Sequence, residues 1–222
     1  MHIRTTAILT FAALALSGVT ACAPSPSETA GAPTGSAGAA PSTAALPAER
    51  LQELLLAASD LDDGTTVRSG DTVSRPQDTS VLDCEPLQRL GDGSGDPFAD
   101  LVSRAKAVIV GTSGRRTTEE LYSAPPAELA QGIRRIMDAM AACPTYQLAT
   151  ATSVAQIDTR AVPAPHLGQE QWAQVVTAST GGRSSVTEQI IVRDGVLLLV
   201  VSGPPAEIRA HAEKAWAKAT SH

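Results

Sequence analysis

Three segments carry apolar residues at the three- and four-residue intervals that are typical of amphipathic helices. The first is 47–61, which has a proline at its expected start. The second is 124–143, which we expect to begin at Pro126 and to place Cys143 at the end of its buried stripe. The third is 204–219. The three stripes consist of Leu51, Leu54, Leu55 and Ala58; of Leu129, Ile133, Ile136, Met137 and Met140; and of Ile208, Ala212, Ala215 and Trp216.

Strand patterns fill the chain between these helices. Segment 105–123 is typical of a hairpin with a Gly/Arg turn, and 145–162 of one or two strands. Segment 171–201 predicts three strands, joined by a Gly-rich turn and by the tight turn Asp194-Gly195. Because 196–201 is apolar at every position, we expect a central strand that is covered on both faces. The sequence therefore predicts an α+β fold, with helices packed on a twisted antiparallel sheet.

The N-terminus has the pattern of a secretory signal peptide. Within 1–21, Arg4 precedes an apolar run, and small residues lead up to Cys22. The tetrapeptide VTAC resembles the bacterial lipobox, in which the cysteine thiol receives a diacylglyceryl group before cleavage. Cys22 is therefore the predicted lipidation site, and two or more acyl chains such as palmitate give stable membrane attachment. The alternative is an ordinary signal peptide that is cut nearby and leaves Cys22 free.

The composition changes sharply after Cys22. Residues 23–46 are almost all Ala, Pro, Ser, Gly and Thr, with Glu28 as the only charge. Such a segment buries too little apolar surface to fold, so we expect 22–46 to be a lipidated cysteine followed by a flexible tether. An O-glycosylated stalk would use the same residues. The remainder, 47–222, has the length of one domain.

The charge balance excludes some classes of partner. The chain of 222 residues has a formal net charge of −6, and removal of Arg4 with the signal peptide takes it to −7. We therefore expect no binding to nucleic acid and no electrostatic adsorption to an anionic membrane surface. Aromatic residues make up only 3% of the chain, which provides few stacking platforms for sugars or single-stranded nucleic acid.

Two cysteines remain after Cys22. Cys84 and Cys143 have no CxxC spacing, and outside the cytoplasm such a pair is expected to form a structural disulfide. The bridge would close a loop of about 60 residues and stabilise the domain by up to about 4 kcal/mol. Two separate buried thiols are the alternative.

Other candidate chemistry is sparse in the mature sequence. Its histidines are His166, His211 and His222, without HxxxH or HExxH spacing, so we expect surface histidines and no metal site. There is no G-x-S-x-G elbow, and we expect no catalytic residue and no cofactor. The acidic loops 60–64 and 91–100 do not place ligands as an EF-hand does, and solvated turns are expected there.

Two Gly/Arg loops are candidates for anion binding. Backbone N–H groups in 111–116 and 179–185 lie next to Arg115, Arg116 and Arg183, which could together hold a small anion. The alternative is that both loops are hairpin turns with exposed arginines, because Gly and Ser are common turn residues.

Three short motifs carry a family resemblance. LLLAASDLDDG, VLDCEPL and AACPTYQL, followed by a strand meander and a final helix, resemble the sensor-type extracytoplasmic domains of actinobacteria. These domains occur as lipoproteins and as the outer domain of mycobacterial serine/threonine kinases of the PknH type. The resemblance covers about 48–220 and implies a disulfide-tied helix layer over a twisted antiparallel sheet with a cleft, and ligand sensing without catalysis. The kinase domain has a second disulfide, for which this chain has no cysteines.

These observations lead to one functional hypothesis and two alternatives. We expect a lipid-anchored, non-catalytic sensor module on the outer face of the cell membrane, which binds a small ligand or an envelope protein. A carrier of lipid or another apolar molecule would instead need a large dry cavity. A cell-wall enzyme would need a convergent cluster of His, Ser or carboxylate groups.

Overall fold

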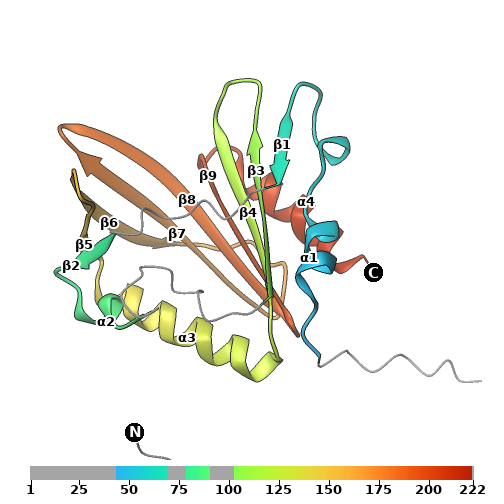
Figure 1. Ribbon diagram of the computed structural model, residues 1–222, viewed down its shortest axis with the longest axis horizontal. Helices are drawn as coiled ribbons and strands as arrows, with labels where there is room; N and C mark the ends of the chain where they lie inside the picture. The colour runs from blue at the N-terminus through green and yellow to red at the C-terminus, as the bar shows by residue number, and fades with distance from the viewer. Residues whose placement is uncertain (1–43, 70–78, 91–102, 222) are drawn as a thin grey trace, which may run out of the picture. The chain divides into compact units, whose positions relative to one another are not determined.

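The computed structural model describes residues 44–69, 79–90 and 103–221, and within them nine strands form one antiparallel sheet (Figure 1). The strand order is β1-β3-β4-β9-β8-β7-β6-β5-β2. The strands are β1 (Thr66–Ser69), β2 (Ser80–Leu82), β3 (Ser103–Val110), β4 (Arg116–Ser123), β5 (Thr145–Ala149), β6 (Val154–Val162), β7 (Glu170–Thr180), β8 (Arg183–Asp194) and β9 (Leu197–Gly203). The helices are α1 (Ala48–Leu54), the 3-10 turn η1 (Ala58–Asp60), α2 (Glu85–Gln88), α3 (Pro126–Ala142) and α4 (Ile208–Thr220).

Several sequence predictions fall outside these residues. The expected signal peptide 1–21, Cys22, most of the tether, the acidic loop 91–100 and His222 are among them. The predicted division into signal peptide, tether and domain therefore stays a prediction.

Strand β9 is the central element of the sheet. It lies between β4 and β8, and its residues alternate between the two faces. Leu198 and Val200 point to one face, Leu199 and Val201 to the other, and all four are at most 3% exposed. The prediction of a strand covered on both sides is confirmed.

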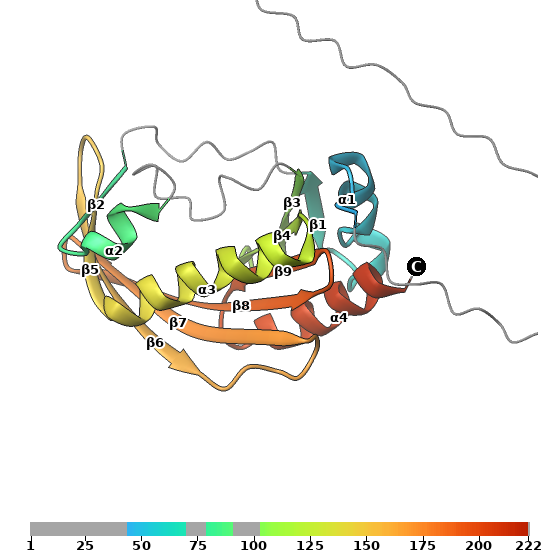
Figure 2. The same ribbon diagram turned by 90° about the horizontal axis from the view of Figure 1, so that it is seen from below.

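Helices cover both faces of the sheet, as Figure 2 shows. We call them the α3 face, on which α3 packs, and the α4 face, on which α1 and α4 pack. The helix residues buried on the α3 face include Leu129, Ile133 and Ile136; those buried on the α4 face include Leu51, Leu54, Ile208, Ala212, Ala215 and Trp216. The α+β fold is confirmed, and its apolar side chains form one core on each face.

The first helix is shorter than its pattern predicts. It ends at Leu54, and Leu55 is extended, so the prediction of a helix through 61 with Ala58 on its buried face is wrong. The reason is tertiary, because the N–H of Leu56 donates to the carboxylate of Glu119 and is not free to continue the helix. The extended conformation also lets Leu55 and Leu56 both be buried.

The other predicted helices are close to their expected bounds. α3 begins at Pro126 as predicted, and Cys143 is the buried residue at its C-terminal cap. α4 begins at Ile208, because the preceding residues form a turn. Segment 145–162 forms two strands, β5 and β6.

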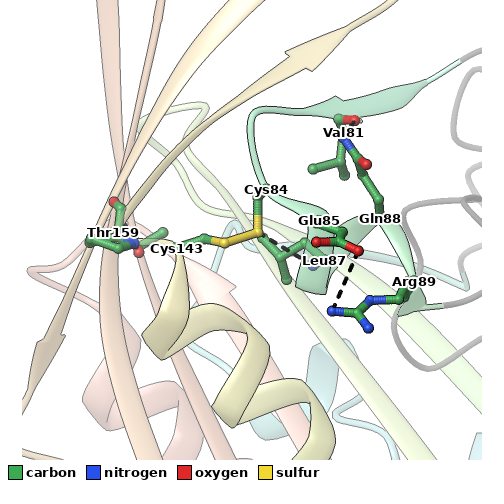
Figure 3. The surroundings of a disulfide bond; sticks show 9 residues. Val81, Cys84, Glu85, Leu87, Gln88, Arg89, Cys143 and Thr159 are labelled. Atoms are coloured by element: carbon green, nitrogen blue, oxygen red, sulfur yellow. Dashed lines mark hydrogen bonds and ion pairs between the residues drawn. A yellow bond between two sulfur atoms is a disulfide. The ribbon is translucent and has the colours of Figure 1, made fainter.

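A disulfide joins Cys84 to Cys143, which confirms the predicted pairing (Figure 3). Their Cα atoms are 5.9 Å apart, and both residues are buried. Cys84 caps the N-terminus of α2, where its sulfur accepts a hydrogen bond from the N–H of Leu87 at 3.3 Å. The bridge therefore fastens the short segment of β2 and α2 to the C-terminal end of α3.

We predict that replacing both cysteines, as Cys84→Ala with Cys143→Ala, lowers the free energy of unfolding by about 4 kcal/mol, because the unfolded chain regains the freedom of the closed loop. Urea denaturation of the wild type and the double variant measures the difference. Reduction of the wild type with dithiothreitol is the control and should shift the midpoint by a similar amount. An unchanged midpoint in both experiments would contradict a stabilising role for the bridge.

Candidate functional site

The sheet divides where its central strand ends. β9 stops at Gly203, and its last partners are Thr118 on β4 and Glu188 on β8. Beyond these pairs the β3–β4 and β7–β8 hairpins continue with no described strand between them, and Figure 1 shows them diverging. We call this place the fork. A Cβ atom on Gly203 would lie 2.6 Å from the Thr117 hydroxyl, so only glycine permits the close approach at its base.

Four polar side chains line the base of the fork on the α3 face. Thr118, Ser202, Gln189 and Gln174 are aligned by the strand register, one from each of β4, β9, β8 and β7. We call them the polar row. The Nε2 of Gln174 donates to Gln189 Oε1 at 2.8 Å, and the Nε2 of Gln189 donates to Ser202 Oγ at 3.2 Å. Thr118 Oγ1 donates to the backbone oxygen of Ser202 at 3.4 Å.

The polar row is set into the surface rather than fully solvated. Gln174 is only 6% exposed, and the other three residues are half-buried. At one end α3 closes the row, since Met140 Sδ lies 3.6 Å from the Nε2 of Gln174. Trp172 lies on the same face two residues earlier in β7 and packs against the core under α3. The row therefore combines hydrogen-bonding groups with an adjacent apolar surface.

The charges next to the polar row are paired. Lys106 and Glu120 face each other across β3 and β4 and form an ion pair, and Tyr122 donates to Glu120 Oε2 at 2.6 Å. Further along the same face, Arg193 pairs with Glu170 at 2.6 Å. These two pairs are each neutral, and Arg116 is a further charged residue on this face, two residues from Thr118 along β4.

The three arginines of the predicted anion site lie on two hairpins. Arg115 belongs to the turn of the β3–β4 hairpin and pairs with Glu207 at 3.6 Å. Arg116 is the first residue of β4, and Arg183 is the first residue of β8, at the tip of the other hairpin. No hydrogen bond or ion pair joins the three within the part of the chain that the structure describes, and anion binding stays a prediction.

The remaining candidates have local roles. His166 is exposed, with Nδ1 3.2 Å from Gln171 Nε2, and His211 is half-buried, with Nδ1 3.1 Å from the oxygen of Glu207. In the acidic loop 60–64, Asp60 pairs with Lys218 at 2.6 Å. Among residues 44–69, 79–90 and 103–221, no three His, Cys, Asp or Glu side chains are grouped to hold a metal ion. Nor does any helix in these ranges have the length and apolar character needed to cross a membrane.

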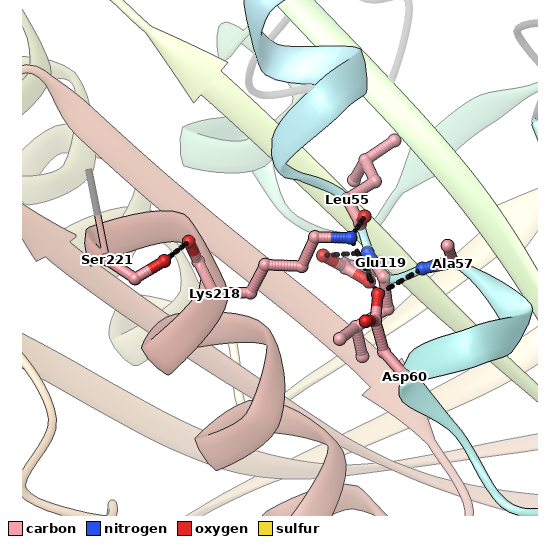
Figure 4. A network of polar contacts seen from close by, with 7 residues as sticks. Leu55, Ala57, Asp60, Glu119, Lys218 and Ser221 are labelled. Atoms are coloured by element: carbon pink, nitrogen blue, oxygen red, sulfur yellow. Dashed lines mark hydrogen bonds and ion pairs between the residues drawn. The ribbon is translucent and has the colours of Figure 1, made fainter.

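A second polar cluster lies on the α4 face, where it fastens the N-terminal segment to the sheet (Figure 4). We call it the Glu119 cluster; it consists of Glu119, Leu56, Asp60 and Lys218. The fully buried carboxylate of Glu119 accepts from the Leu56 N–H at 3.2 Å and 3.4 Å. Lys218 Nζ on α4 donates to the oxygen of Leu55 at 2.7 Å and to Asp60 at 2.6 Å. Three separate parts of the chain therefore meet at this point.

Burial and hydrogen bonds shift the pKa values of the two carboxyl groups in this cluster in opposite directions. Loss of hydration raises the pKa of Glu119 to about 7, and the Leu56 N–H and the positive charge of Lys218 offset only part of that rise. The pKa of Asp60 is lowered, mainly by its hydrogen bond from Lys218 and next by the N–H of Ala57. Near neutral pH the Glu119 carboxyl is therefore partly protonated, while Asp60 is ionised.

The sequence contains a signal for one of these residues. Gln174 interrupts the apolar run from Trp172 to Val176, and a polar residue at a buried strand position needs a partner. Gln189 and Glu119 stand next to Glu188 and Glu120, so neither is distinguished from its polar neighbours. Which residues are the partners depends on strand order, which the local pattern does not contain.

We predict that Glu119→Gln removes a pH dependence of stability. The folded-state pKa of about 7 lies above the ordinary value of 4.5, so the folded state binds this proton more tightly between the two values. The free energy of unfolding should therefore fall as the pH rises through this range, by about 3 kcal/mol in total. In the glutamine variant, urea denaturation at pH 5 and pH 8 should show a correspondingly smaller difference.

Glu188→Gln is the matched control for this prediction. Glu188 is a second buried carboxylate on the α4 face, paired with Arg209 at 3.2 Å. This variant retains the Glu119 carboxyl and should keep the difference in stability between pH 5 and pH 8. Equal pH dependence in the wild type and Glu119→Gln would rule out the assignment to Glu119.

Comparisons with known proteins identify the fold. No protein-family model and no curated protein sequence matches the chain. The crystal structure of the extracellular domain of PknH from Mycobacterium tuberculosis matches with a TM-score of 0.56 and 13% identity, over 80% of this chain and 96% of that chain. An uncharacterised protein from Mycobacterium smegmatis, the Rv0999 ortholog, matches with a TM-score of 0.41 and 12% identity, over 76% of this chain and 96% of that chain. The resemblance to the PknH-type extracellular sensor domain, expected from the sequence, is confirmed for the fold.

Proposed function

We propose that this protein is a lipid-anchored, non-catalytic binding or sensor module on the outer face of the cell membrane, and that its ligand binds at the polar row. The observation that carries the proposal is the row itself, a line of half-buried amide and hydroxyl groups at the base of the fork. Binding sites typically combine a few fixed polar groups with apolar surroundings, as the row and Trp172 do. The shared fold with a kinase extracellular domain supports the same reading.

The attachment of the N-terminal segment fits this proposal. The N–H of Leu46 donates to Ser123 Oγ at 2.8 Å, and Ser123 Oγ donates to the oxygen of Val196 at 2.8 Å. Ser123 is the last residue of β4, whereas Thr118 of the polar row is its third residue. The five residue steps from Thr118 to Ser123 span about 17 Å along the strand. A tether from a lipidated Cys22 would thus join the sheet at the end remote from the polar row.

In this arrangement the ligand site is turned away from the point of attachment. A site next to the tether would favour ligands that lie in the membrane. A site at the other end of the sheet favours soluble ligands or components of the cell envelope beyond the lipid headgroups. The geometry therefore supports a binding module over a carrier that extracts lipid from the membrane.

The anchor is tested by metabolic labelling with a clickable fatty acid in the native host. We expect label on the wild type and none on Cys22→Ala, because the thiol is the only acceptor of the diacylglyceryl group in the proposed processing. Cys84→Ala is the control and should keep the label. Unlabelled wild-type protein, or undiminished label on Cys22→Ala, would refute the lipid anchor.

The binding function is tested by native mass spectrometry of protein purified from its own host. We expect retention of a polar small molecule, and loss of that molecule in Gln174→Met, a variant of similar volume that removes the amide. Thr177→Val, a change on the opposite face of β7, is the control and should retain it. A retained lipid in addition to the N-terminal modification would contradict the proposal and favour the carrier.

A further inference from the structure

We infer that the polar row recognises an uncharged ligand that carries several hydroxyl groups, such as a sugar or another polyol. This inference rests on the proposed function, since it assigns a ligand class to the proposed site. Three features of the site support it: the hydrogen-bonding capacity that the row leaves unused, the paired charges of Lys106 and Glu120, and the position of Trp172.

A hydrogen-bond acceptor lies at the buried end of the row. Gln174 is 6% exposed, and both of its hydrogen bonds to described residues use Nε2, so Oε1 has no partner among them. Within the described ranges, Gln171 Oε1 is the one side-chain oxygen or nitrogen that is both inaccessible to solvent and without a partner. Because Gln174 Oε1 also has no partner but is not in this class, it retains some contact with solvent. Gln174 therefore presents a fixed acceptor at the surface of an otherwise buried side chain.

The other members of the row add further groups. Each amide nitrogen has two N–H groups, and each hydroxyl can donate one hydrogen bond and accept two. The Nε2 of Gln189 uses one N–H toward Ser202, and the Ser202 hydroxyl is left with its own O–H to donate. Thr118 Oγ1 donates to a backbone oxygen and can still accept. Donors and acceptors thus lie side by side along the row, as a ligand with hydroxyl groups requires.

The spacing of the row suits a ligand larger than one functional group. Neighbouring strands lie about 4.8 Å apart, so four adjacent strands spread the row over about 14 Å. The strands fix these positions, and the hydrogen bonds from Gln174 to Gln189 and from Gln189 to Ser202 fix the amide orientations. A site that is organised before binding loses little conformational entropy when the ligand arrives.

The two charged side chains next to the row on β3 and β4 are paired with each other. Lys106 is paired with Glu120, which also accepts from Tyr122, so neither charge is available to a ligand without breaking a contact. Carboxylate and phosphate ligands are usually held by unpaired arginine or lysine. The nearest candidate is Arg116, which lies on the same face two residues beyond Thr118, at the exposed rim. The row itself therefore favours an uncharged ligand.

An aromatic side chain lies on the same face as the row. Trp172 is half-buried, lies on the same strand and face as Gln174, and packs against the apolar core of the α3 face. An indole ring beside a hydrogen-bonding row offers an apolar surface to the C–H face of a sugar. With a single such ring, the hydrogen bonds of the row supply most of the specificity.

The inference is tested by tryptophan fluorescence of the full mature chain in detergent. The background variant Trp216→Phe leaves Trp172 as the only tryptophan of the mature chain. We expect a saturable change on titration with neutral oligosaccharides, with maltotriose and triacetylchitotriose as probes. Thr118→Val and Ser202→Ala should each weaken this binding about tenfold, the effect of one lost hydrogen bond.

The controls separate recognition from folding. Thr177→Val, on the opposite face of β7, should leave the affinity unchanged, and the melting temperatures of all variants show whether they fold. If the row only fixes strand register, Thr118→Val and Ser202→Ala will lower the melting temperature, and titration with the oligosaccharides will give no saturable change in fluorescence. That result would overturn the inference. Binding that is lost in Arg116→Ala or in high salt would show an anionic ligand, which overturns the uncharged class but keeps the binding module. A lipid retained in native mass spectrometry would instead refute the proposed function.

Discussion

The structure depends on one strand that is apolar on both sides. β9 presents Leu198 and Val200 to one face and Leu199 and Val201 to the other, so water must be excluded from both faces at once. Helices α3 and α4 supply that cover. β9 ends at Gly203, and beyond Val201 it has no apolar side chain that a helix must cover. At this end of the strand, polar side chains replace the apolar ones on the α3 face. The candidate site thus lies where the core ends.

A second constraint is the buried carboxyl of Glu119. A charge in this position is costly, and the rise of its pKa to about 7 reflects that cost. The cluster nevertheless fixes the place where α1 ends, because Leu56 must turn its N–H toward the carboxylate. Lys218 then holds the adjoining residues from the other side. The segment from Leu55 to Asp60 is consequently part of the domain, although Glu119 and Lys218, which bind it, lie far away in the chain.

The sequence was sufficient where local pattern decides the outcome. The stripes of α3 and α4, the two-sided run of β9 and the Asp194-Gly195 turn all follow from neighbouring residues, and the disulfide followed from cysteine number and compartment. The early end of α1 did not, because the competing hydrogen bond comes from Glu119, far away in the chain. The short edge strands β1 and β2 carry too few residues to show a period. The polar row could not be predicted from the sequence, because its four residues become neighbours only through the order and register of the strands.

The hydrogen bond from Lys218 to Leu55 joins residues 163 positions apart, and this separation affects how the protein is made. The core on the α4 face needs Leu51 and Leu54 from the first helix and Trp216 from the last. Loops of such length close slowly, and their contacts cannot form before both ends exist. The domain can therefore complete its folding only when almost the whole chain has left the ribosome. Until then the core on the α4 face remains incomplete.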